Sequence, residues 1–405
     1  MISCITPYTP IFENLIPRTP FMKHTHFLST LLISLLLTAL TSCKNETTPN
    51  PVTYFPVLEV SGSHYEIGKA VGETFQFQIT EAFDRSEEIY SYVEAFIDQD
   101  TMMYYHSFLD KVQNTYPQFI EELQGMADGS GLPFKKFMIY STFSEYIAML
   151  QNPAIKNITG CSSVSYSENG QLFLAHNEDG QPDFYDLMFI VKAHPTGKPS
   201  FISFCYPGMI MGIAPSMNDK GIFYSGNYIS GKKIQLGGIP NSFVQRSLME
   251  ATTMDEAIAK ATISDRAYCY HVNIASAVDQ KIVSIEVAPS KFYLQEVVGW
   301  FVHTNHFFQL GMDSLCFDDP NSLSRYQVLT SLVDGESTKS TTIEGNTLTE
   351  FLSSHENAPD SPCAHGVSNG ITGQTLGSTL FDINAQTWRI SYNNPCENKF
   401  QIIGF

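Results

Sequence analysis

The chain has 405 residues, of which 43% are hydrophobic and 16% charged, so it can form a large core, and intrinsic disorder is excluded. It carries 41 acidic against 23 basic side chains, a formal net charge of −18. This charge argues against nucleic-acid binding, since phosphates require a basic face, and against electrostatic docking on anionic lipid.

Residues 1–43 are predicted to be a signal region for export. Residues 27–40 are an uncharged apolar run, shorter than the ~20 residues of a spanning helix but typical of the core of a signal peptide. A short basic segment starts at Met22, where translation is expected to begin. Cys43 ends a Leu-Thr-Ser-Cys sequence similar to the lipobox of bacterial lipoproteins. We therefore expect a periplasmic or outer-membrane lipoprotein of the bacterial cell envelope, lipid-anchored through Cys43; a signal cleaved without lipidation is the alternative.

Residues 44–56 read as a polar, Pro-containing tether, and residues 57–160 as a mainly helical pro-segment or small subunit. Apolar side chains recur at helical spacing over 64–77, 103–126 and 134–149. Gly68 and Gly72 lie one turn apart in the first of these helices, which indicates close packing of helices and not a membrane contact.

From Cys161 onward the apolar period changes from helical to alternating, and residues 161–405 are predicted to be a strand-rich domain. Residues 161–177 form a predicted hairpin around the turn Glu168-Asn169-Gly170. Further strands are predicted over 187–194, 200–206, 209–215, 222–229, 270–278, 281–288, 291–305 and 401–405, a hairpin of two strands over 378–384 and 387–393, and helices over 242–251, 322–332 and 348–354. This pattern predicts an α+β fold whose sheets need helical covers.

The sequence Gly160-Cys161 stands at the head of this domain. A cysteine that becomes an N-terminus carries its own base, because a free α-amino group has a pKa of roughly 7.7–8.0. Gly160 permits the backbone geometry that thiol attack on the preceding carbonyl requires. We therefore predict self-cleavage between Gly160 and Cys161, with Cys161 as the nucleophile; a buried structural cysteine is the alternative.

The remaining cysteines carry no metal pattern. Setting aside Cys161 and the two cysteines of the signal region leaves an odd number, with no C-x-x-C spacing: Cys205, Cys269, Cys316, Cys363 and Cys396. This spacing gives neither a zinc signature nor a complete disulfide framework, although one bridge between Cys363 and Cys396 is a hypothesis. No metal and no organic cofactor is predicted.

Several motifs in this order resemble the peptidase C45 family, typified by the acyltransferase that makes penicillin from isopenicillin N. The resemblance covers roughly residues 60–400 and rests on Tyr65-Glu66-Ile67-Gly68, Gly125-Met126-Ala127, Gly160-Cys161-Ser162-Ser163, Asn177-Glu178-Asp179, Met217-Asn218-Asp219-Lys220-Gly221, Ile285-Glu286-Val287 and His303-Thr304-Asn305-His306-Phe307. This family belongs to the N-terminal nucleophile hydrolases, with choloylglycine hydrolases and penicillin V acylases. The resemblance implies a four-layer αββα sandwich, preceded by the helical pro-segment, with a catalytic part from Cys161 to the C-terminus.

Three further residues are candidates for the active site. Asp179 lies at the far end of the first hairpin, where its carboxylate is expected to hold the new α-ammonium group and tune its pKa. Asn305, in a polar cluster at the end of an apolar strand, is expected to donate to the oxyanion. Asn227 matches a second oxyanion-type Asn of the bile-salt hydrolase relatives. Arg325 and Glu145 are interpreted as structural ion-pair partners, with a role in orienting the substrate or the precursor loop as the alternative.

One departure from the family pattern concerns substrate choice. Family members often carry an Arg directly after the cysteine that corresponds to Cys363, whereas this chain has Ala364 and His365 there. An arginine in that place would bind a substrate carboxylate or stabilise the site, so its absence weakens any transfer of substrate specificity.

The leading hypothesis is an autoprocessed cysteine hydrolase or acyltransferase that acts on a linear amide bond of a small molecule through an acyl-Cys161 intermediate. A Cys–His peptidase without self-cleavage, with His176, His303 or His306 as base, is a second hypothesis. A non-catalytic envelope lipoprotein that binds a ligand on the same scaffold is the third.

Overall fold

A computed structural model describes residues 54–99, 102–150, 160–339, 342–368 and 371–405. The predicted signal region, the lipobox with Cys43 and most of the tether therefore lie outside the described residues. Among the residues that are described, no helix is long and apolar enough to cross a membrane.

The described chain builds two β-sheets. Sheet A has eight strands in the order β1-β4-β5-β6-β7-β8-β9-β10. Its strands are β1 (Val57–Gly62), β4 (Phe189–Pro195), β5 (Phe201–Cys205), β6 (Ser216–Asn218), β7 (Ile222–Tyr228), β8 (Tyr270–Ser276), β9 (Lys281–Val287) and β10 (Phe292–Glu296). Sheet B has the order β11-β2-β3-β13-β14-β15, with β12 paired to β13. Its strands are β2 (Ser162–Glu168), β3 (Gln171–Gly180), β11 (Gly299–His303), β12 (His365–Ser368), β13 (Ile371–Asp382), β14 (Thr387–Tyr392) and β15 (Phe400–Ile403).

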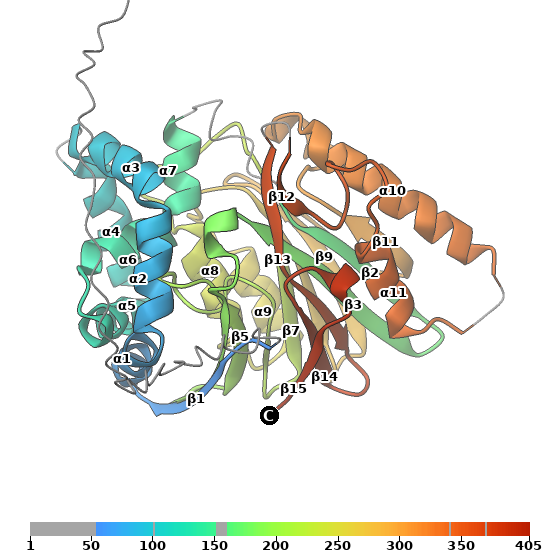
Figure 1. Ribbon diagram of the computed structural model, residues 1–405, viewed down its shortest axis with the longest axis horizontal. Helices are drawn as coiled ribbons and strands as arrows, with labels where there is room; N and C mark the ends of the chain where they lie inside the picture. The colour runs from blue at the N-terminus through green and yellow to red at the C-terminus, as the bar shows by residue number, and fades with distance from the viewer. Residues whose placement is uncertain (1–53, 100–101, 151–159, 340–341, 369–370) are drawn as a thin grey trace, which may run out of the picture. The chain divides into compact units, whose positions relative to one another are not determined.

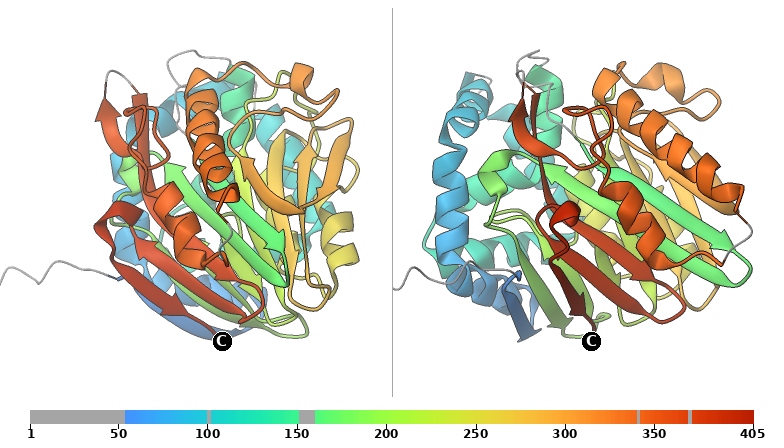
Figure 2. Two further views of the ribbon diagram at one scale, coloured as in Figure 1. Left: turned by 90° about the vertical axis from the view of Figure 1, so that its right-hand side faces the viewer. Right: turned by 45° about the vertical axis from the view of Figure 1, so that its right-hand side comes forward.

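Helices cover both outer faces of this pair of sheets (Figures 1 and 2). On the side of sheet A lie α1 (His64–Thr74), α2 (Gln76–Arg85), α3 (Glu87–Gln99), α4 (Met103–Thr115), α5 (Pro117–Ser130), α6 (Phe134–Ser141), α7 (Phe143–Leu150), α8 (Asn241–Leu248) and α9 (Met254–Ala261). On the side of sheet B lie α10 (Pro320–Ser337) and α11 (Gly345–Leu352). Between the sheets, the rings of Phe223 from β7 and Phe381 from β13 pack edge to face at 5.4 Å. The predicted four-layer αββα arrangement is therefore confirmed.

The β2–β3 hairpin forms the centre of sheet B. Its turn is made by Asn169 and Gly170, whose φ angles of 53° and 76° are those that a tight two-residue hairpin turn requires. The two faces of the hairpin differ in composition. Val164, Phe173 and Ala175 pack under α10 and α11 in a separate apolar cluster, while the alternate residues face sheet A. This alternation turns Ser163 toward sheet A, where it contacts Asn227, whereas Ser162 and Asn177 contact residues of α10 and α11.

Residues 57–160 do more than form helices. The segment 57–62, which was not predicted as a strand, is β1 and pairs in parallel with β4 at the edge of sheet A. Its six residues alternate between exposed and half-buried, a pattern too short to stand out from the adjoining helix. The buried pair Glu122–Arg246, at 2.9 Å, ties α5 to α8 as well. The N-terminal part is thus built into the same core as the strand-rich part.

The predicted helix–helix contact through Gly68 is confirmed. A Cβ atom at Gly68 would overlap the backbone carbonyl of Glu122 in α5, and a Cβ at Gly125 would overlap the carbonyl of Tyr65 in α1. Glycines on both helices therefore let the two backbones touch, which no larger residue permits.

Some predicted elements are divided in the structure. The helix predicted over 103–126 is two helices, α4 and α5, because Pro117 has no N–H to continue the first and fits the first turn of the second. The strand predicted over 291–305 is β10 of sheet A followed by β11 of sheet B; Gly299, with φ 68°, lies at the crossing. The strand predicted over 209–215 is wrong, since the next strand, β6, begins only at Ser216.

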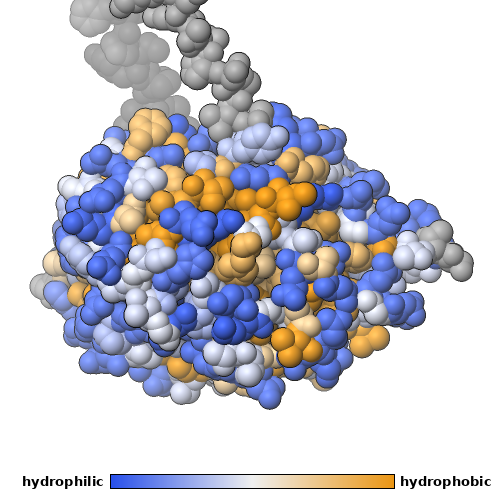
Figure 3. All heavy atoms as spheres, turned by 90° about the horizontal axis from the view of Figure 1, so that it is seen from below, coloured by the Kyte–Doolittle hydropathy of each residue, from blue (hydrophilic) through white to orange (hydrophobic). Residues whose placement is uncertain are grey.

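The face seen from below is mostly hydrophilic, with hydrophobic side chains gathered near its middle (Figure 3). Large hydrophobic side chains with high exposure include Leu310 and Val278.

Candidate active site

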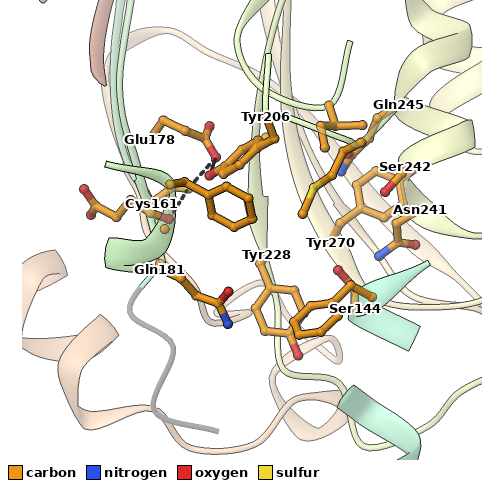
Figure 4. A pocket seen from close by; sticks show the side chains of 18 of the residues that line it. Ser144, Cys161, Glu178, Gln181, Tyr206, Tyr228, Asn241, Ser242, Gln245 and Tyr270 are labelled. Atoms are coloured by element: carbon orange, nitrogen blue, oxygen red, sulfur yellow. Dashed lines mark hydrogen bonds between the residues drawn. The ribbon is translucent and has the colours of Figure 1, made fainter. Parts of the chain in front are cut away.

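Cys161 lies directly before β2, between β11 and β3 at the centre of sheet B, and only 4% of its surface is exposed. It borders a cavity that opens between the sheets and the N-terminal helices. Figure 4 shows Cys161 and Glu178 on one side of this cavity and Asn241 and Gln245 on the other, with Tyr206 and Tyr228 between them. Six of the residues that line it are aromatic: Tyr140, Phe143, Phe184, Tyr206, Tyr228 and Tyr270.

The Cys161 thiol has acidic neighbours. Its Sγ lies 3.7 Å from Glu178 Oε1 and 3.9 Å from the backbone carbonyl of Asp179. Burial raises the pKa of the Cys161 thiol well above its ordinary value, and the carboxylates of Glu178 and Asp179 raise it further. In the uncut chain the thiol is therefore neutral and needs a base before it can act as a nucleophile.

Asp179 occupies the position that the hairpin predicts, beside Cys161. Thr375 Oγ1, from β13, donates to Asp179 Oδ1 at 2.6 Å, whereas Asp179 Oδ2 has no hydrogen-bond partner within the described part of the chain. Burial raises the pKa of Asp179 to about 7, although the Arg325 charge and the Thr375 hydrogen bond oppose this rise. The buried carboxyl group of Asp179, in the residue whose carbonyl contacts Cys161, thus has one oxygen without a donor among the residues that the structure describes.

The two predicted asparagines also reach the site. Asn227 Nδ2, from β7 of the opposite sheet, donates to the carbonyl of Cys161 at 3.0 Å. Asn305 follows β11, and its Nδ2 donates to the carbonyl of Tyr228 at 2.8 Å, which leaves a second N–H on the same nitrogen. A Cβ atom at Gly160 would overlap the Asn305 side chain, so Gly160 lies directly against this amide. The structure therefore brings together all the predicted site residues in the described chain.

The interpretation of Arg325 as a structural ion-pair partner is incomplete, because in the structure its guanidinium hydrogen-bonds to residues of the site. Its Nη1 donates to the carbonyl of Cys161 at 2.8 Å and to Ser162 Oγ at 2.9 Å, and its Nη2 donates to Asn305 Oδ1 at 2.7 Å. Within the described ranges no carboxylate lies at ion-pair distance from its guanidinium. Arg325 is 1% exposed, and its hydrogen bonds hold the backbone of Cys161 and the side chain of Asn305 together.

Sequence reasoning missed Glu178 as a member of the site. Glu178 Oε1 accepts from Tyr206 Oη at 2.7 Å, and Glu178 Oε2 hydrogen-bonds with His176 Nε2 at 3.1 Å. The hairpin itself contained the signal. Ser162 pairs with Asn177, so Cys161 stands opposite Glu178, and alternation points positions 176 and 178 to the same face.

The histidines do not support a Cys–His pair. His176 hydrogen-bonds with Ser163 Oγ through Nδ1 and with Glu178 through Nε2. Both ring nitrogens of His303 are also engaged, and burial lowers the pKa of His306 to about 4. Among the described residues, no histidine nitrogen hydrogen-bonds to the thiol of Cys161.

A comparison with protein families decides the relationship. The model of the acyl-coenzyme A:6-aminopenicillanic acid acyl-transferase family matches residues 166–397, which is more than half of the chain. The chain belongs to this acyl-transferase family. The family resemblance predicted from the motifs is thereby confirmed, and the acyl-transferase family model covers most of sheet B and all of β4–β10.

This acyl-transferase family member is also similar to individual proteins. The beta-alanyl-dopamine/carcinine hydrolase of Drosophila melanogaster is 30% identical over 252 residues, a stretch that covers 58% of this chain and 65% of the relative. Two variants of the conjugated bile acid hydrolase from Clostridium perfringens have a TM-score of 0.41 at 14% and 15% identity, and each match covers 60% of this chain and 92% of the other. The chain thus spans about two thirds of the curated relative's length.

Proposed function

We propose that this protein is an enzyme that cleaves itself before Cys161 and then hydrolyses a linear amide, or transfers its acyl group, through an acyl-Cys161 thioester. The observation that carries the proposal is the buried Oδ2 of Asp179, near Cys161, which has no hydrogen-bond partner among the described residues. Cleavage of the Gly160–Cys161 bond releases an α-amino group at this place, and as an ammonium it would supply the missing donor. Family membership supports the same chemistry.

Self-cleavage begins with attack of Cys161 Sγ on the carbonyl carbon of Gly160. The peptide C–N bond breaks, a thioester forms, and the thiol proton ends on the freed α-amine. Water then hydrolyses the thioester and leaves Gly160 with a carboxylate. The tight contact between Gly160 and Asn305 places an amide donor beside the carbonyl that develops negative charge.

Turnover uses the same residues. The α-amine of Cys161 takes the thiol proton, and Sγ attacks the substrate's amide carbonyl. Asn305 stabilises the tetrahedral oxyanion, and the α-ammonium returns the proton to the leaving amine as the C–N bond breaks. Water hydrolyses the acyl-enzyme, or a second amine accepts the acyl group. Asp179 holds the α-ammonium in place throughout these steps.

The lining of the cavity indicates a substrate class. Its aromatic residues include Phe143, Phe184 and Tyr270. Among the described residues that line it there are the carboxyl groups of Glu178 and Asp179 but no Lys, Arg or His. Acidic groups and aromatic faces favour an ammonium group and disfavour a carboxylate. The relative's name, which denotes a β-alanyl amide, agrees with an amine-bearing substrate. We propose a linear amide that carries an amine rather than penicillin V or an anionic bile-salt conjugate.

The test is intact mass and hydrolysis by the purified chain beside Cys161→Ala, with Cys205→Ala, a buried thiol outside the cavity, as the matched control. We expect two fragments that meet at Gly160/Cys161, activity on β-alanyl-dopamine or carcinine, and loss of both in Cys161→Ala only. An uncut active chain, or activity that survives in Cys161→Ala, would overturn the proposal. Preference for the anionic amides would overturn the substrate class alone.

The lipid anchor is a second part of the proposal. It rests on the apolar run 27–40 and on the sequence that ends at Cys43. When the full chain is produced in a bacterium, we expect it in the membrane fraction. Cys43→Ala should move it to the soluble fraction; an unchanged distribution would refute anchoring at Cys43.

A further inference from the structure

Four side chains that carry metal-ligand atoms converge on the far side of β13 from the nucleophile. His355 follows α11, Cys363 precedes β12, His365 begins β12, and Cys396 lies in the short helical turn Pro395–Glu397. One nitrogen or sulfur from each lies within 4.8 Å of all the others. The spacing along the chain contains no zinc motif, so only the fold brings this set together.

The two nitrogen–sulfur distances of the cluster fit a tetrahedral metal ion, and the nitrogen–nitrogen distance is about 0.3 Å shorter than such a site requires. His365 Nε2 lies 3.0 Å from His355 Nε2 and 3.4 Å from the sulfurs of both Cys363 and Cys396. Bonds of about 2.3 Å to sulfur and about 2.0–2.1 Å to nitrogen imply about 3.3–3.8 Å between ligand atoms at tetrahedral angles. Hydrogen bonding does not account for this arrangement. The Nε2 atom of His365 has either one proton or one lone pair, whereas its three close neighbours would require three hydrogen bonds.

We propose that His355, Cys363, His365 and Cys396 bind a structural Zn²⁺ ion. Two thiolates and two neutral imidazoles form a closed four-ligand set, which is typical of structural sites and leaves no position for a substrate. Two thiolates also neutralise the ion's charge, which suits a site where Cys363 is 1% exposed. His355 and His365 are exposed and give the ion a path from solvent.

The surroundings of the cluster resemble the outer shell of a metal site. Asn394 Nδ2 contacts Cys363 Sγ at 3.4 Å and donates to the carbonyl of Ala364 at 2.7 Å. The amide is thus placed to donate toward a thiolate and holds the peptide between two of the ligands.

The cluster is connected to the catalytic aspartate by a short chain of hydrogen bonds. The N–H of Ala364, between the ligands Cys363 and His365, donates to Thr375 Oγ1 at 2.9 Å, and Thr375 Oγ1 donates to Asp179 Oδ1 at 2.6 Å. A bound ion would hold the segment 363–365 in place, and through it the orientation of Thr375.

A disulfide between Cys363 and Cys396, the hypothesis that the sequence allowed, is the competing state. In the structure both cysteines are free thiols. A disulfide and the zinc site exclude one another, because the disulfide removes two of the four ligands.

The experiment measures zinc by elemental analysis in the full chain carrying Cys161→Ala. This change keeps the chain uncut and takes one ligand from the second cluster of possible metal ligands, that of Cys161, His176 and Glu178. Metal binding is thereby tested independently of catalysis. After reduction and exposure to Zn²⁺ we expect about one ion per chain. Added Cys396→Ala or His355→Ala should abolish binding, whereas Cys205→Ala, outside the cluster, should not.

Replacement of zinc by Co²⁺ checks the same site without mutation. We expect the intense visible absorption of tetrahedral Co²⁺ and, as a separate band at shorter wavelength, charge transfer from the thiolates to the metal. Absence of stoichiometric zinc in the reduced chain, or zinc that persists in Cys396→Ala and His355→Ala, would overturn the proposal. A Cys363–Cys396 disulfide in the chain isolated without reductant, with no zinc bound, would overturn it in favour of the redox state.

Discussion

Asp179 is expected to destabilise the uncut chain at neutral pH, even though the proposed mechanism requires its carboxylate. Its carboxylate is buried, one oxygen has no partner in the described structure, and burial raises its pKa from an ordinary 3.8 to about 7. Between these two values the folded chain keeps a proton that the unfolded chain has lost. The free energy of unfolding therefore falls as pH rises from about 4 to about 7 and stays low above it.

The magnitude follows from the same two values. At 1.36 kcal/mol per pKa unit, the difference between 3.8 and about 7 amounts to about 4 kcal/mol of lost stability above pH 7. Asp179→Asn removes the ionisation and keeps an oxygen that accepts from Thr375. We expect this variant to be about 4 kcal/mol more stable than its parent at pH ~8, and within about 1 kcal/mol of it at pH ~4.

Urea unfolding of Cys161→Ala and Cys161→Ala/Asp179→Asn, both uncut, at several pH values measures this difference. Asp110→Asn is the matched control, because Asp110 is exposed. A variant less stable than its parent at pH ~8, or a difference that does not grow with pH, would refute the reasoning and imply a partner for Asp179 before cleavage. In the chain that retains Cys161, the substitution Asp179→Asn should abolish self-cleavage, which a measurement of intact mass detects.

Three other changes test the packing around the site and beneath it. Gly160→Ala should slow self-cleavage, measured by intact mass over time, because its methyl group overlaps Asn305; Gly335→Ala, at a helical glycine with open space around it, should leave cleavage unchanged. Arg325→Lys should lower kcat by about 10²-fold or more, since an ammonium does not reproduce the forked contacts of the guanidinium; an unchanged kcat would remove Arg325 from the site. Gly68→Ala should lower the free energy of unfolding by about 3 kcal/mol or more in urea titration, because its methyl overlaps backbone in α5, and a neutral effect would contradict the close packing of the two helices.

Local sequence patterns predict much of the fold and one neighbour relation in the site. Helical and alternating periods located the N-terminal helices and most strands, because these periods reflect which face of each element is buried. The β2–β3 hairpin follows from its Asn169-Gly170 turn, and its register alone sets Glu178 opposite Cys161. The unbroken helices and the single long strand predicted over 291–305 failed, because a helix break or a crossing between sheets changes hydrophobic period very little.

The contacts that only the tertiary structure decided join residues separated by long stretches of chain. Arg325 lies 164 residues from the carbonyl it binds, and Thr375 lies 196 residues from Asp179. The ligand cluster of His355, Cys363, His365 and Cys396 likewise forms from a loop, a strand and a helical turn. Sequence alone determined that a cysteine heads a buried strand of an acyl-transferase family member. It did not determine which distant side chains surround that cysteine, because they meet only when α10 and β13 pack against the hairpin, and this packing depends on the whole core rather than on any local pattern.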